Sequence, residues 1–131
     1  MSEENVDHYG RVLDAWNRGA VDELVEGMAH TVEIRTALTG VEGSYLGHDG
    51  ARRWWQDYHD VFPDWHAELV RVRAIGNATL AELRLIGHGG ESGAPVDQQI
   101  WHVVHWQDGL AVRISRHDSE TEALEAVGLS E

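Results

Sequence analysis

Residues 45–65 read YLGHDGARRWWQDYHDVFPDW, and no other stretch of the chain says as much about the fold. Two glycines near its start, Gly47 and Gly50, mark a turn, and Pro63 marks the end of the helix that follows. That helix carries four large aromatic residues: Trp54, Trp55, Tyr58 and Phe62. Few small domains place so many aromatic rings on one helix unless the rings enclose a hydrophobic cavity, so we predict a cavity beside this helix.

The composition limits the chemistry that the chain can perform. At 131 residues it is long enough for a single domain, residues 1–131, with its own hydrophobic core. The absence of cysteine excludes disulfides and thiolate metal sites, and we expect neither a metal nor another cofactor. All ten basic residues are arginines, so Schiff-base chemistry through lysine is also excluded.

The charge and hydropathy patterns bear on partners and compartment. A formal net charge of −13 argues against nucleic acid and anionic membrane surfaces as partners. No apolar run approaches the roughly 20 residues of a membrane-spanning helix. The first residues, Met-Ser-Glu-Glu-Asn, lack the basic region of a signal peptide, so we expect a soluble cytoplasmic protein.

Periodicity and turn residues predict helices early in the chain and strands later. We expect helices over residues 6–16, 21–28 and 48–61, with a first strand over residues 31–36. Further strands are expected over residues 65–74, 79–88, 96–106 and 110–117. Asp108-Gly109 predicts a tight hairpin between the last two strands. Ser119 begins a capping-box pattern that predicts a last helix, which Gly128 can end.

The turn and packing motifs of the chain resemble a known superfamily. These motifs are Tyr45-Leu46-Gly47-His48-Asp49-Gly50, Phe62-Pro63-Asp64, Asp108-Gly109 and Ala123-Leu124-Glu125-Ala126. From Tyr9 to Leu129 the chain resembles the SnoaL-like branch of the nuclear-transport-factor-2-like superfamily. The resemblance implies an α+β fold, in which a cone-shaped curved, mainly antiparallel sheet wraps around N-terminal helices, with a short C-terminal helix. Characterised relatives include polyketide cyclases, ketosteroid isomerases, epoxide hydrolases and noncatalytic binding modules.

The chain departs from each catalytic pattern of these relatives. SnoaL-like cyclases carry an acid on the last strand, where this chain has Arg116. Epoxide hydrolases need Arg-x-Asp on a middle strand, where this chain has Leu83-Arg84-Leu85. Ketosteroid isomerases use acids on the first and penultimate strands, where this chain offers Glu33 or Ile34, and then His102. The isomerase-like arrangement is the least altered.

Period-two alternation predicts which strand residues face the cavity. Val112, Ile114 and Arg116 share one face of the last strand, and the apolar pair predicts that Arg116 points inward. On the penultimate strand both faces are apolar: Ile100, His102, Val104 and Trp106 form one set, and Trp101, Val103 and His105 the other. We therefore predict a homodimer that partly buries Trp101 and Val103 on the outer face.

Three residues are candidates for catalysis. His102 could act as a proton acceptor because imidazole titrates near neutrality, although a hydrogen-bonded core histidine is an equal alternative. Arg116 could stabilise a developing oxyanion, or form a structural ion pair with Glu33 or Asp118. Glu33 could act as a base if it faced the cavity; the alternative is that Val32 and Ile34 face inward and Glu33 lies in solvent.

Two classes of function stay open, both with a small-molecule ligand. The first is an acid/base enzyme of the cyclase or isomerase type that acts on a lipophilic or carbonyl-bearing substrate. The second is a noncatalytic binding or accessory module of the same fold, and a weaker third reading is a protein-interaction domain. For either of the first two, we expect four aromatic residues to contact the ligand: Trp16, Trp54, Tyr58 and Trp65.

Overall fold

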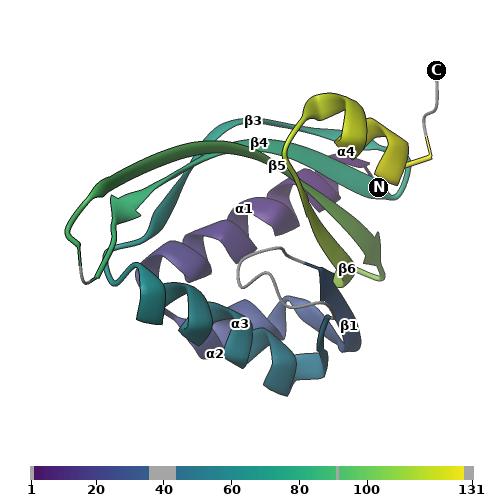
Figure 1. Cartoon of the computed structure of the whole chain (residues 1–131). Coiled ribbons are helices and arrows are strands. Elements are labelled where there is room, and N and C mark those ends of the chain that lie inside the picture. The colour runs from purple at the N-terminus through teal and green to yellow at the C-terminus, as the bar shows by residue number, and fades with distance from the viewer. Residues whose placement is uncertain (1, 36–43, 91, 129–131) are drawn as a thin grey trace.

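The framework of the molecule is a strongly curved sheet (Figure 1). The computed structural model describes residues 2–35, 44–90 and 92–128. The described strands form one six-stranded sheet in the order β2-β1-β6-β5-β4-β3. They are β1 (Met28–Arg35), β2 (Tyr45–Leu46), β3 (His66–Ile75), β4 (Ala78–His88), β5 (Pro95–Gln107) and β6 (Leu110–His117). Among these strands, β1 and β6 pair in parallel, and the other neighbouring strands pair antiparallel.

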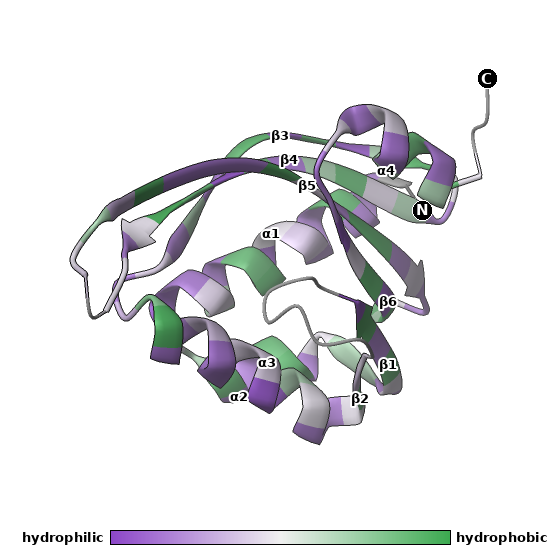
Figure 2. Ribbon diagram, in the orientation of Figure 1, coloured by the Kyte–Doolittle hydropathy of each residue, from purple (hydrophilic) through white to green (hydrophobic). Residues whose placement is uncertain are grey.

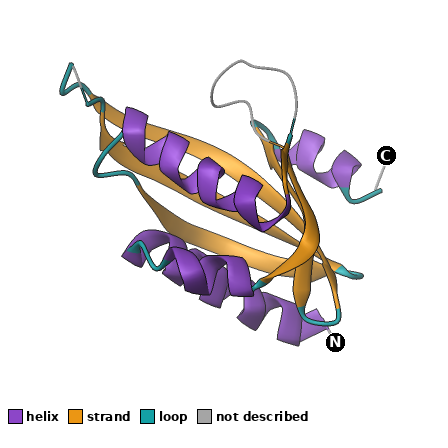
Figure 3. Ribbon diagram, turned by 90° about the horizontal axis from the view of Figure 1, so that it is seen from below, coloured by secondary structure: helices purple, strands orange, loops and turns teal. Residues whose placement is uncertain are grey.

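Three helices lie on the inner side of the sheet, and a fourth lies on the outer side (Figures 1 and 3). The inner helices are α1 (Ser2–Arg18), α2 (Val21–Glu26) and α3 (Gly47–Val61). The outer helix is α4 (Glu120–Ala126), whose first turn is capped by a hydrogen bond from the Glu122 backbone N–H to the Ser119 side chain. The predicted α+β architecture, a curved and mainly antiparallel sheet around N-terminal helices with a short C-terminal helix, is confirmed.

The core lies between the inner helices and the inner face of the sheet. Figure 2 shows apolar and polar bands alternating along the helices and strands, as expected for elements with one buried face. On β1 the fully buried residues are Val32 and Ile34, so the aliphatic side chains of this strand face inward. The side-chain amide of Asn17 ties the end of α1 to edge strand β3, because it bonds both the N–H and the carbonyl of Ala67 at 2.9 Å.

The second helix and the start of the sheet differ from the sequence prediction. The second helix ends at Glu26, and Met28, which was expected in that helix, begins β1 and is 2% exposed. Strand β2 was not predicted, because Tyr45 and Leu46 are only two residues and precede a glycine-rich helix start. Thr36, expected at the end of the first strand, lies outside the described residues.

A bulge in the last hairpin corrects one predicted face. The register shifts between the pair His105–Arg113 and the pair Trp106–Ala111. As a result Ala111 is fully buried in the core, whereas Val112, which was expected to face inward, is half-buried. One extra residue in a strand is enough to move a side chain to the other face.

The outer face of β5 is covered by the chain's own α4. Val103 is fully buried there, in a second hydrophobic cluster with Ala78, Leu80 and Ala123, and Trp101 packs against the same cluster. The apolar residues that led us to predict a subunit interface are therefore buried within the chain, so that argument for a dimer fails. The dimer itself stays a prediction. Within the described part of the chain, none of the helices is long and apolar enough to cross a membrane.

Candidate functional site

An aromatic-lined cavity lies between α1, α3 and the inner face of the sheet. Its wall is formed by Tyr9, Val12, Leu13, Trp16, Leu24, Trp54, Tyr58, Trp65, Ala67, Leu85 and His102. The four residues predicted to contact a ligand, Trp16, Trp54, Tyr58 and Trp65, are all in this wall. The structure therefore brings them together, and their role in ligand binding stays a prediction.

The aromatic rings fill most of the space that they surround. Trp16 lies 4.6 Å from Trp54 between ring centroids and meets Tyr58 edge-on at 5.5 Å. Phe62 stacks on Trp65 at 4.4 Å at the other side of the cluster. The remaining cavity is about 30 Å³, roughly the share of one water molecule in the liquid. Sites for small organic ligands usually measure about 300 Å³ or more, so a ligand requires these rings to move apart.

His102 forms a polar point in the cavity wall. It extends from the inner face of β5, and its register partner on the adjacent strand β6 is Arg116. Its ring centroid lies 6.5 Å from that of Trp54. Burial, and then the nearby charges of Arg116 and His117, lower the pKa of His102 to about 3. At neutral pH the imidazole is therefore uncharged, and it can donate and accept hydrogen bonds but is a weak proton acceptor.

Arg116 points inward as predicted from the alternation of β6. Its side chain is 11% exposed, and its Nη1 donates a hydrogen bond to the Tyr58 hydroxyl at 3.3 Å. Its Nη2 lies 3.6 Å from a carboxylate oxygen of Asp118, so Asp118 rather than Glu33 is its acidic neighbour. The guanidinium thus bonds one wall residue of the cavity, Tyr58, and Arg116 is the register partner of another wall residue, His102, on the adjacent strand.

Glu33 is not brought to this site. Its carboxylate lies on the side of β1 opposite Val32 and Ile34, where it accepts hydrogen bonds from Arg35 at 3.0 Å and Ser44 at 3.2 Å. The hydrogen bond from Arg35, assisted by the charge of Arg113, lowers the pKa of Glu33, and the opposing effect of burial is smaller. Of the two orientations that the sequence left open for β1, the structure has the one in which Val32 and Ile34 face inward, so Glu33 does not face the cavity as a base of raised pKa.

Four residues of the cavity wall have buried polar atoms without a hydrogen-bond partner among the described residues. The indole N–H groups of Trp16, Trp54 and Trp65 are buried, as is the Tyr9 hydroxyl, and none of the four bonds another described atom. Two tryptophans outside the wall behave differently: Trp55 donates to the Trp16 carbonyl, and Trp106 donates to Thr79. A buried donor without an acceptor costs about 1–3 kcal/mol, so the wall is suited to an occupant with acceptor oxygens.

Tyr9 is an aromatic wall residue that was not among the predicted site residues. It was used only as part of the helical period of α1. Its spacing from Trp16 is two helical turns, which puts both aromatic side chains on one face of the helix. That spacing was a usable signal.

The site has no sign of a metal centre. No group of three or more histidine, aspartate or glutamate side chains that could hold a metal ion occurs in residues 2–35, 44–90 and 92–128. None of the described residues in the cavity wall is acidic. The wall therefore offers aromatic surface, hydrogen-bond donors and one neutral imidazole.

Comparison with known proteins agrees with this architecture. The family model of the SnoaL-like domain matches residues 9–114. No curated protein matches the chain by this comparison. Among solved structures, Bal32a from a soil-derived mobile gene cassette is 18% identical with a TM-score of 0.81, and 95% of this chain and 96% of that chain are covered.

Two further structures carry names that refer to enzymes. A protein named as a candidate SnoaL-like polyketide cyclase from Jannaschia sp. CCS1 is 19% identical with a TM-score of 0.78, covering 99% of this chain and 92% of its own. A protein named as a candidate ketosteroid isomerase from Kribbella flavida DSM 17836 is 20% identical with a TM-score of 0.73, covering 91% and 80%. At these identities the likeness shows a shared fold.

Proposed function

Because the chain belongs to the SnoaL-like domain family, we propose that it binds a lipophilic, carbonyl-bearing small molecule in the aromatic cavity. One observation carries this proposal: three residues of the cavity wall, Trp16, Trp54 and Trp65, each have a buried indole N–H without a described hydrogen-bond partner. Apolar rings favour a lipophilic body, and unpaired donors favour an acceptor oxygen on it. A hydrocarbon of the same shape would leave every donor unpaired.

The indole N–H resonances of the protein provide a direct test. We would titrate ¹⁵N-labelled protein with 1-tetralone and, as a matched hydrocarbon, tetralin. We expect the ketone to bind at least about tenfold more tightly, the free-energy equivalent of one hydrogen bond, and to shift the indole N–H signal of Trp16, Trp54 or Trp65. The indole signal of Trp106, which already bonds Thr79, should not move.

Two tryptophan variants make the test specific. Trp54→Phe removes one cavity donor and keeps an aromatic ring, so it should reduce the preference for ketone over hydrocarbon. Trp101→Phe is the matched control, because Trp101 packs against α4 on the outer face of the sheet. Equal affinities for the ketone and the hydrocarbon in the unaltered protein would overturn the proposal.

A second candidate function is an enzyme of the isomerase or cyclase type. The juxtaposition of the Arg116 guanidinium, the Tyr58 hydroxyl and the neutral His102 favours it, because donors of this kind stabilise an enolate oxygen. The names of the Jannaschia and Kribbella structures favour it as well. Against it stands the lack of a described carboxylate in the cavity wall and the weak basicity of His102. Noncatalytic binding is therefore the function that the geometry supports best.

Hydrogen–deuterium exchange of 1-tetralone distinguishes noncatalytic binding from isomerase-type catalysis. The C2 protons of 1-tetralone are acidic, so an enzyme that forms an enolate would accelerate their exchange in heavy water. We expect exchange no faster than in buffer that contains the His102→Gln variant. Acceleration by the unaltered protein that His102→Gln abolishes would instead establish the isomerase-type reading.

A further inference from the structure

A basic groove lies where β1, β5, β6 and α4 meet, and it adjoins the aromatic cavity, because Arg116 lines the groove and also bonds Tyr58 of the cavity wall. It has a volume of about 370 Å³ and is lined by three arginines, two histidines and a serine, with Ala126 of α4 at its border. These residues are Arg35, Arg113, Arg116, His105, His117 and Ser115. None of the described residues that line it is acidic. In a chain with a net charge of −13, this concentration of arginine requires an explanation.

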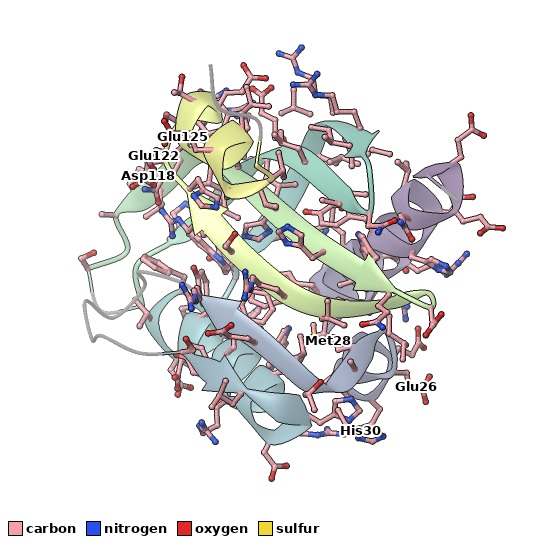
Figure 4. The ribbon with its side chains drawn as sticks, turned by 90° about the vertical axis from the view of Figure 1, so that its right-hand side faces the viewer. Glu26, Met28, His30, Asp118, Glu122 and Glu125 are labelled. Carbon is pink, nitrogen blue, oxygen red and sulfur yellow. The ribbon has the colours of Figure 1, made fainter. Side chains whose placement is uncertain are left out.

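Acidic residues lie near the groove, and one of them, Asp118, has a carboxylate oxygen 3.6 Å from Nη2 of Arg116. Figure 4 shows Asp118, Glu122 and Glu125 together at α4 and the turn before it, and none of these three lines the groove. Arg35 and Arg113 share a single carboxylate, that of Glu33, at 3.0 and 3.5 Å. Their side chains are 61% and 53% exposed, so each guanidinium retains N–H groups that can bind another acceptor.

Two groove residues carry buried nitrogen atoms without a partner. They are Nε of Arg116 and Nδ1 of His105, neither of which bonds any described residue. Burial lowers the pKa of His105, with a further contribution from the charge of Arg113, and burial also lowers the pKa of His117. Both imidazoles are therefore neutral at neutral pH; Nε2 of His117 already bonds the Ser115 hydroxyl at 2.8 Å, whereas His105 has one nitrogen, Nδ1, without a described partner.

The spacing of the arginines indicates the size of the ligand. Arg113 and Arg116 are three residues apart on β6, so their Cα atoms are about 10 Å apart at the strand rise of 3.3 Å per residue, and their side chains leave opposite faces of the strand. Among the described residues, the pairing of β6 with β1 ends at the pair Arg35–Ser115. A single phosphate or carboxylate cannot reach both ends of such a groove.

We propose that this groove binds a small organic polyanion that carries oxyanionic groups at two ends. One group pairs with the exposed guanidiniums of Arg35 and Arg113, in the geometry that arginine offers to carboxylate and phosphate oxygens. The other lies toward Arg116. The proposal does not depend on the function proposed for the aromatic cavity.

Citrate, its neutral trimethyl ester and inorganic phosphate are suitable probes of the full chain. Titration calorimetry at about 0.1 M salt, where charges beyond roughly 10 Å are screened, limits the repulsion from the rest of this acidic protein. We expect citrate to bind more tightly than phosphate, and the neutral ester not to bind. Citrate that binds no better than its ester would overturn the proposal.

Arginine variants locate the binding. Arg113→Gln and Arg35→Gln should each weaken citrate binding by about tenfold, the usual effect of one charge-assisted pair. Arg84→Gln is the matched control, because Arg84 is an exposed arginine of β4 that pairs with Asp97 outside the groove. Circular dichroism would verify that each variant is folded. Equal citrate affinity in all three variants would mean adventitious binding, and would overturn the proposal.

Light scattering on the same samples tests whether a second copy of the chain, rather than a small anion, occupies the groove. If Arg113→Gln changed the molar mass of the protein while citrate failed to bind, the groove would be an interface between copies of the chain. That result would also overturn the proposal.

Discussion

The Nη1 atom of Arg116 donates a hydrogen bond to the Tyr58 hydroxyl, and this 3.3 Å contact joins the last strand to the third helix. The two residues are far apart in the sequence, yet the contact places a guanidinium at the margin of the aromatic cavity. In a largely buried position such a hydrogen bond both stabilises the protein and orients the charge.

A double-mutant cycle on Arg116 and Tyr58 should detect this contact. Tyr58→Phe removes only the hydroxyl and should lower the free energy of unfolding by about 1 kcal/mol. Arg116→Met should cost more, because Arg116 is 11% exposed and also lies near Asp118. Urea denaturation of the two single variants and the double variant would give a coupling of about 0.5–1.5 kcal/mol. Additive effects would mean that the hydrogen bond contributes nothing to stability.

The pH dependence of stability should report His102. Its pKa in the folded protein, about 3, lies below the value near 6.5 of an unfolded histidine. Below pH 6.5 the unfolded chain binds the extra proton, so the free energy of unfolding falls as the pH decreases toward 3. Between pH 6.5 and about 5, where model carboxyl groups remain ionised, His102→Gln should flatten this decline by about 1 kcal/mol or more. An unchanged slope in urea midpoints across that range would contradict the burial of a neutral imidazole.

Two glycine substitutions should have opposite effects. A Cβ at Gly50 would lie 2.9 Å from the carbonyl carbon of Tyr45, so Gly50→Ala forces α3 away from β2 and should destabilise by about 1–3 kcal/mol. Gly10 lies within α1 with nothing within 4 Å of its Cβ position. Gly10→Ala should therefore stabilise by about 0.5–1 kcal/mol, since alanine is the better helix former. Thermal melts of the two variants would show whether the signs differ as expected.

The hydrogen bond between Trp106 and Thr79 should matter because both partners are buried. Trp106 Nε1 donates to Thr79 Oγ1 at 2.9 Å, and Thr79 is fully buried. Thr79→Val keeps the shape and removes the acceptor, which should cost about 1–3 kcal/mol. Thr79→Ser keeps the hydroxyl and serves as the control for the indole bond. If chemical denaturation ranked the serine variant far below the valine variant, packing rather than the hydrogen bond would be decisive.

The turns and alternating strands predicted most of the fold, because their signals are local. Asp108 and Gly109 both have positive φ, 54° and 81°, as the tight hairpin read from their sequence requires. Features set by distant contacts could not be predicted in this way. Strand β2 is too short to give a period, and the bulge beside Ala111 depends on its partner strand.

The sequence predicted several residues of the candidate site, but it did not predict the size of the cavity or the packing of its aromatic rings. The inward direction of Arg116 and the presence of His102 beside the aromatic cluster follow from period-two alternation. The small size of the cavity depends on how the rings of Trp16 and Trp54 pack, which no sequence period specifies. The same holds for Val103, whose outer-face position was predicted but whose cover by α4 was not.

The parallel pairing of β1 with β6 also constrains how the chain can fold during synthesis. Ile34 of β1 lies beside Ile114 of β6, so β1, which is synthesised early, can form this pairing only after β6, the last described strand, has left the ribosome. Until then the backbone edge of β1 that pairs with β6 has no partner strand. A chaperone or a neighbouring chain could bind that edge. Contacts of such large sequence separation also slow folding, since the intervening chain must be ordered before they form.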